Sequence, residues 1–231
     1  MTQCTTTADL FPACKSRKID VDFEGGDITS DAGSLLLRQV DRKIGLTKDL
    51  NKALRDPRRR GSCEHTQLAM YRQRIYGLIL GYEDLNDHDT LRDDLALQTA
   101  VESDKVLASS PTLCRLENRA DRESARQISL LMVEKFIQSF KTSPKRLVLD
   151  FDATDDPVHG QQEGRFFHGY YDHYCFLPLY VFCGSQLLAA YLRPSNIDGA
   201  RHAWAILSLL VKLLRKQWPG VKIIFRGDSG F

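Results

Sequence analysis

The sequence predicts an α+β protein with an N-terminal helical region, residues 1–143, and a following α/β region, residues 144–231. Three observations support this fold class. Apolar residues recur at helical spacing before Pro144, which is typical of packed helices. After Pro144, short runs rich in β-branched and aromatic residues take over. Two of these runs lead into aspartates, at Asp152 and Asp228.

The helical region should contain a series of amphipathic helices. Leu68, Ile75 and Tyr82 belong to one apolar stripe, which is the usual pattern of a helix-bundle core. Start and stop signals delimit the segments, among them Gly45 after the first helix and Pro144 after the last. Helices are expected at about residues 31–44, 64–82, from 91, 111–119 and 122–140.

The α/β region should begin with a strand and a β-hairpin. Residues 147–149 form a short apolar run of the kind found in a strand buried on both faces. Two further strand-like runs, residues 174–183 and 186–192, are joined by Gly184-Ser185. A two-residue link of this type predicts a hairpin.

A helix and a last strand should complete this region. The apolar spacing predicts a helix over about residues 199–218, followed by a strand over residues 221–225. The helix crossover lets this strand lie parallel to the first one and beside it. The order of strand, hairpin, helix and strand is that of the ribonuclease H-like fold. We expect an incomplete version, since the sequence stops three residues after Asp228.

Aspartates at the ends of two neighbouring parallel strands suggest a metal site. Their carboxylates would repel each other unless a cation lay between them. Mg²⁺ or Mn²⁺ would remove that conflict and create a Lewis acid for phosphodiester chemistry. We predict Asp152 and Asp228 as catalytic metal ligands, with Asp150 behind them because it shares a face with Asp152.

Composition excludes several other classes of protein. The chain is 42% hydrophobic and 27% charged, with a net charge of +2, so charge alone does not argue for nucleic acid. Six scattered cysteines without a CxxC pair predict reduced thiols and a cytoplasmic protein rather than a zinc site. No apolar run is long enough to cross a membrane.

Several segments resemble the "DDE domain, group 1" transposases of bacterial insertion sequences. The two acidic blocks of that family are similar to residues 149–160 (LDFDATDDPVHG) and 225–231 (FRGDSGF). Similar blocks upstream are residues 28–33 (ITSDAG), 88–94 (HDTLRDD) and 111–119 (PTLCRLENR). The blocks occur in the family's order along essentially the whole chain.

This resemblance implies a transposase that cuts double-stranded DNA at element ends and joins the ends to a target. Asp152 and Asp228 would match the first two catalytic aspartates, and Mg²⁺ or Mn²⁺ would be the cofactor. The family's catalytic glutamate lies further downstream, where this sequence has no counterpart. We therefore expect a truncated transposase that is inactive by itself, acts as a homodimer and has no membrane contact.

The helical region also contains candidate DNA contacts. A helix opened by Pro111 would display polar and basic side chains suited to phosphates and base edges. A basic loop precedes the second helix. The candidates are Thr112, Arg115, Asn118 and Arg119 on the helix, and Arg58, Arg59 and Arg60 in the loop. Solvated helix and loop positions are the alternative interpretation of both groups.

Two other functions are compatible with the motifs. Asp150-Phe151-Asp152-Ala153-Thr154 is a D-x-D-x-T sequence, the signature of haloacid dehalogenase-like phosphohydrolases. In that case Asp150 would be the nucleophile and Asp152 the acid/base. The hairpin after the first strand and the long helical region argue against this fold. The third possibility is a non-catalytic DNA-binding fragment.

Overall fold

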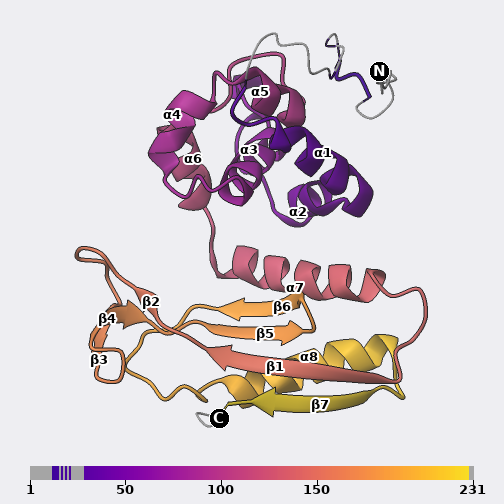
Figure 1. Cartoon of the computed structure of the whole chain (residues 1–231), viewed down its shortest axis with the longest axis vertical. Helices are drawn as coiled ribbons and strands as arrows, with labels where there is room; N and C mark the ends of the chain where they lie inside the picture. The colour runs from indigo at the N-terminus through magenta and orange to yellow at the C-terminus, as the bar shows by residue number, and fades with distance from the viewer. Residues whose placement is uncertain (1–11, 16, 18, 20, 22–28, 229–231) are drawn as a thin grey trace, which may run out of the picture. The chain divides into compact units, whose positions relative to one another are not determined.

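A computed structural model of the chain describes residues 12–15, 17, 19, 21 and 29–228 (Figure 1). The last residues of the second acidic block, 229–231, lie outside the described part. The chain divides into two compact units, Met1–Ala125 and Arg126–Phe231. The first unit is helical, and the second combines strands with helices.

Most helices of the first unit form near the segments where the apolar spacing predicts them, with two exceptions. Helix α2 (Leu46–Ala53) has no counterpart among the expected helices, and the helix expected from residue 91 begins instead at Leu95, after α4 has ended at Leu91. The Asp94 side chain caps α5 by accepting from the Leu97 N–H at 2.7 Å. The helices are α1 (Gly33–Ile44), α2 (Leu46–Ala53), α3 (Gln67–Ile79), α4 (His88–Leu91), α5 (Leu95–Val101) and α6 (Ser110–Glu117), with 3₁₀ turns η1 (Arg60–Ser62) and η2 (Leu85–Asp87).

Helix α1 directs its polar side chains inward. Arg38 and Asp41 are buried, whereas Leu36, Val40 and Ile44 are about half exposed. An amphipathic helix usually buries its apolar stripe. Here the polar face points inward because it has polar partners there. Tyr76 of α3 donates a hydrogen bond to Asp41, and the carboxylate of Glu102 lies 3.7 Å from Arg38 Nε.

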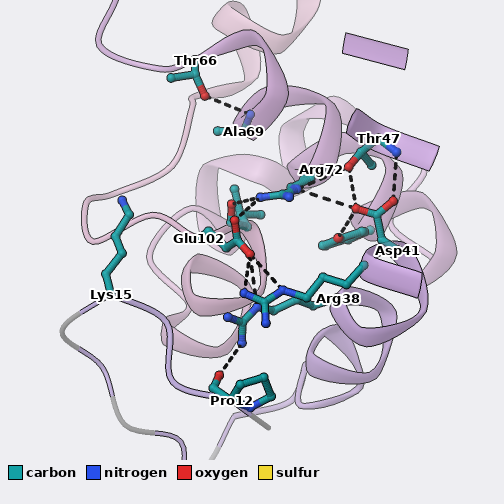
Figure 2. A network of polar contacts seen from close by, with 12 residues as sticks. Pro12, Lys15, Arg38, Asp41, Thr47, Thr66, Ala69, Arg72 and Glu102 are labelled. Carbon is teal, nitrogen blue, oxygen red and sulfur yellow. Dashed lines mark hydrogen bonds and ion pairs between the residues drawn. The ribbon is translucent and has the colours of Figure 1, made fainter. Parts of the chain in front are cut away.

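The centre of this polar network is Glu102, the residue after α5 (Figure 2). Its carboxylate accepts from Arg72 Nη1 at 2.7 Å and from Arg42 Nη2 at 2.8 Å, and Arg38 Nε lies 3.7 Å away. Asp41 supports the same network, since it accepts from the Thr47 N–H at 2.9 Å and lies 3.7 Å from Arg72 Nε. The network joins α1, α3 and α5 through charge, beside the apolar core that the same helices share.

The ionisation of Glu102 should make the helical unit sensitive to acid. Burial opposes ionisation, but hydrogen bonds from Arg72 and Arg42 outweigh it and lower the pKa of Glu102 from 4.5 to about 2. A carboxyl with a depressed folded-state pKa stabilises the fold above its unfolded pKa, and that stability is lost as pH falls toward the folded value. We expect unfolding free energy to fall between about pH 4.5 and pH 2, measured by urea unfolding at successive pH values. A shallower slope for Glu102→Gln than for the unaltered chain would assign the difference to Glu102, since Asp56, whose pKa is also lowered to about 2, titrates in both proteins.

The second unit contains a four-stranded sheet in the order β6-β5-β1-β7. Strand β1 pairs antiparallel with β5 and parallel with β7, which confirms the predicted return of the last strand beside the first (Figure 1). The strands of this sheet are β1 (Arg146–Ala153), β5 (Leu179–Cys183), β6 (Gln186–Tyr191) and β7 (Lys222–Gly227).

The hairpin predicted around Gly184 is present, but its first strand is shorter than expected. Gly184 has φ +61°, in the left-handed region that favours glycine, and it links β5 to β6. The run expected over residues 174–183 breaks after Phe176, because its first half pairs in a second, three-stranded sheet of order β2-β4-β3. The strands of that sheet are β2 (Asp156–Pro157), β3 (Phe166–His168) and β4 (His173–Phe176).

Two helices cover one face of the larger sheet. Phe136 on α7 (Arg122–Gln138) and Leu214 on α8 (Ala203–Gln217) belong to the same apolar core as Leu147, Leu149 and Phe151 of β1. The expectation that this strand is buried on both faces is wrong, because Asp152 on the opposite face is exposed. The packing of α7 on the sheet also sets the division between the units at residues 125 and 126, ahead of the predicted boundary at residue 143.

Candidate functional site

The predicted catalytic acids follow the paired part of β1 and β7. The last paired residues of the two strands are Phe151 and Gly227, and Asp152 and Asp228 are the next residue along each chain. Neighbouring strands lie about 4.8 Å apart. Both aspartates are exposed, and Asp152 belongs to the face of the sheet away from the apolar core.

Asp150 lies on the same face of β1, but it has a partner of its own. Its register partner on β7 is Arg226, which donates Nε to Oδ1 and donates Nη2 to Oδ2 at 2.7 Å. This hydrogen bond and the charge of Asp150 raise the pKa of Arg226. A guanidinium that binds both carboxylate oxygens neutralises Asp150 and reduces the negative charge behind Asp152.

A histidine that sequence reasoning missed lies close to this edge of the sheet. His173 at the start of β4 has its Nε2 atom 2.8 Å from Oδ2 of Asp155, three residues after Asp152. Tyr171 lies beside the pair, and burial followed by the charges of Asp155 and Asp152 raises the pKa of Tyr171. No local spacing signals this pair, since His173 returns to the strand end only through the β3–β4 hairpin.

Asp152 and Asp228 carry the type of oxygen ligand that a hard divalent cation prefers, but they are only two carboxylates. Asp152 and Asp228 supply carboxylate oxygens, the donors that Mg²⁺ and Mn²⁺ prefer. Within the described residues, no group of three or more histidine, cysteine, aspartate or glutamate side chains is arranged to hold a metal ion. The side chains present therefore fit a site with two protein carboxylates, with Asp150 set apart by Arg226.

The helical unit gathers four of the predicted DNA contacts around one cavity. A cavity of about 410 Å³ is lined by Arg58 from the basic loop and by Thr112, Arg115 and Arg119 at α6 and just beyond it. The other candidates do not contribute to it. Arg59 and Asn118 are exposed, Asn118 donates to Cys114 Sγ at 3.2 Å, and the side chain of Arg60 lies outside the described part.

Asp56 pairs with two of the arginines that line this cavity, although Asp56 itself is not part of the lining. Its Oδ2 accepts from Arg58 Nη2 at 2.7 Å, its Oδ1 accepts from Arg58 Nε at 2.8 Å, and Arg119 Nη1 lies 3.3 Å from Oδ1. The hydrogen bonds from Arg58 lower the pKa of Asp56 from 3.8 to about 2. Sequence reasoning also missed Arg92 and His65, which line the same cavity from separate elements.

The structure does not favour the phosphohydrolase interpretation of the D-x-D-x-T sequence. That fold requires alternating strands and helices after the first strand, whereas β1 lies between antiparallel β5 and parallel β7. Asp150, the nucleophile in that interpretation, is bound through both oxygens by Arg226. Among the described residues, no helix has the length and apolarity needed to cross a bilayer.

One of the comparisons with known proteins identifies the family of this chain. No curated protein and no solved structure matches the chain. The family model described as "Transposase DDE domain group 1" matches residues 11–231, nearly the whole sequence. This chain therefore belongs to the DDE group 1 family of transposases.

Proposed function

We propose that the chain binds the ends of an insertion sequence and supplies catalytic acids for cleaving and joining DNA. The observation that carries this proposal is the parallel pairing of β1 and β7, which ends at Phe151 and Gly227, one residue before Asp152 and Asp228. Family membership supports it, because the two acids stand in the segments that resemble the acidic blocks of DDE transposases. Duplex DNA is then the substrate, and Mg²⁺ or Mn²⁺ is the cofactor.

The strand order supports assignment of the second unit to the ribonuclease H-like class. Its sheet places a hairpin on one side of β1 and a parallel strand, reached through α8, on the other. In that fold, acids from the first strand and from the parallel strand beside it meet at one edge. The strand order β6-β5-β1-β7 supports the proposal that Asp152 and Asp228 meet in this way.

Each residue at the edge has a distinct task in this proposal. Divalent ions bound by Asp152 and Asp228 would activate the attacking water or 3′-hydroxyl and stabilise the leaving oxygen. Arg226 holds Asp150 in a neutral pair, so the edge has two carboxylates to be balanced instead of three. The rigid sheet holds the acids at fixed positions, and small misplacements of such groups are costly for the rate.

The helical unit is proposed to bind double-stranded DNA at the element ends. Arginine and threonine side chains around the 410 Å³ cavity offer donors to phosphate oxygens, and Arg59, Arg60 and Asn118 are further candidates. We further propose that the chain acts as a homodimer in the cytoplasm, since two element ends must be held for joining to one target.

Removing either catalytic aspartate should abolish most divalent metal binding. We expect Asp152→Asn and Asp228→Asn each to weaken Mn²⁺ binding by at least about tenfold, because each change removes one of only two charged ligands. Isothermal calorimetry and the electron paramagnetic resonance signal of free Mn²⁺ would measure the affinity.

The matched control is Glu134→Gln, which removes an exposed carboxylate from α7. It should leave the Mn²⁺ affinity unchanged. Equal Mn²⁺ affinity in all three variants and the unaltered chain would contradict a metal site at the β1–β7 edge.

A further inference from the structure

We propose that the cavity between the basic loop and α6 is a binding site for a DNA backbone phosphate, and that Asp56, which lies outside its lining, competes with this phosphate for Arg58 and Arg119 in the free protein. This inference rests on the proposed DNA-binding function and names the site that would grip the strand. It adds Arg92 to the contacts and gives Asp56 the role of an internal competitor.

The cavity has the size and the charge for such a ligand. Its volume of about 410 Å³ lies in the range of ordinary ligand sites. Four arginines line it, Arg58, Arg92, Arg115 and Arg119. The only carboxylate in its lining is that of Glu64, whose side chain is 72% exposed to solvent.

Asp56 shows how two of the lining arginines, Arg58 and Arg119, hold an oxyanion. One carboxylate is shared by two guanidinium groups, with both oxygens bound by Arg58 and one of them also by Arg119. A phosphodiester presents two unesterified oxygens and one negative charge, which match the same fork of donors. The carboxylate and the phosphate would therefore compete for these two arginines.

Donors remain in the cavity that Asp56 does not satisfy. The Nε atom of Arg92 is buried and has no hydrogen-bond partner among the described residues. Arg115 Nη2 donates to the Thr112 hydroxyl at 3.0 Å, and in the described part of the chain no carboxylate pairs with Arg115 or Arg92. Arg92 and Arg115 therefore bring positive charge to the cavity that no carboxylate of the described residues balances, and a phosphate would balance it.

The local electrostatics agree with an anion site. Burial lowers the pKa of His65 at the cavity wall, and the nearby charges of Arg92 and Arg58 lower it further, against the opposite effect of Glu64. Asp56 lies between α2 and η1, outside the helices. Its side chain can therefore leave the arginines without breaking a helical hydrogen bond.

The test is DNA binding with and without the internal competitor. We expect Asp56→Asn to tighten binding of a 30-base-pair duplex by about tenfold, because Arg58 and Arg119 then lose no carboxylate when the phosphate binds. Arg92→Gln should weaken binding severalfold and reduce the salt slope by about one. Fluorescence anisotropy at two salt concentrations, in EDTA so that the acidic edge holds no metal, would measure both.

The controls separate a cavity effect from a general charge effect. Lys43→Gln removes an exposed charge from α1 in the same unit and should change the affinity by less than twofold. Arg92→Lys keeps the charge and should retain more affinity than Arg92→Gln. Circular dichroism must show the same helical content in every variant.

Three results would overturn the inference. Weaker binding by folded Asp56→Asn would mean that Asp56 orients the arginines instead of competing with DNA. Duplex binding that Asp56→Asn and Arg92→Gln both leave unchanged would place the DNA elsewhere while leaving the proposed function intact. Absence of any duplex binding by the unaltered chain would reject the DNA-binding function together with the cavity.

Discussion

Glu102→Gln should lower the unfolding free energy of the helical unit by about 3–5 kcal/mol. The substitution keeps the shape of the side chain but removes the negative charge that faces Arg38, Arg42 and Arg72. Arg38 is only 1% exposed, so water cannot replace the lost carboxylate there. Breaking a buried charge network from one side leaves the remaining charges uncompensated, which is the costly case.

Urea unfolding followed by circular dichroism at neutral pH would measure this loss. The matched control is Glu117→Gln in the same unit, where the carboxylate is 45% exposed and pairs with Arg74 Nε at 2.6 Å. A surface pair of this type contributes at most about 1 kcal/mol. Similar losses of unfolding free energy in the two variants would show that the Glu102 network stabilises the fold no more than a surface ion pair does.

Arg193→Met should destabilise the sheet unit by about 3 kcal/mol, because several backbone carbonyls lose their donor at once. Arg193 is 1% exposed, and its Nε donates to the Leu177 carbonyl at 2.8 Å. Its Nη1 donates to the Gly199 carbonyl at 2.9 Å and also to that of Arg201. One side chain thus ties the segment between β4 and β5 to the loop before α8.

Methionine keeps much of the volume of arginine, so the change isolates the hydrogen bonds from the packing. Differential scanning calorimetry would measure the shift of the transition. Arg201→Met is the control, since the Arg201 side chain is exposed and only its carbonyl serves as an acceptor. Equal stability of the two variants would contradict this prediction. It would mean that the free energy of the hydrogen bonds from Arg193 to the carbonyls only offsets the cost of burying its guanidinium.

The strand order around Asp152 and Asp228 could be predicted, because it depends on local sequence signals. Alternation and turn chemistry mark β1, the Gly184 hairpin, α8 and β7 from neighbouring residues alone. Once β7 returns parallel to β1 through a helix, the register follows from the lengths of the strands. Asp152 and Asp228 then reach the same edge because each stands at the end of its own strand.

The basic cavity was predicted only in part. Arg58, Thr112, Arg115 and Arg119 are visible as basic or polar positions on two nearby segments. Arg92 joins them from another part of the unit, and the pairing of Asp56 with Arg119 spans 63 positions. Ion pairs over such separations leave no periodic signal in a sequence.

The sequence by itself determined β1, the Gly184 hairpin, α8 and the parallel return of β7, since these elements depend on local periodicity and turn residues. Only the tertiary structure decided that Arg226 binds Asp150, that α7 packs on the sheet, and that α1 turns Arg38 and Asp41 inward. Local hydropathy cannot indicate these outcomes. A buried charge is tolerated only where the fold brings a partner to it, and that partner comes from a distant part of the chain.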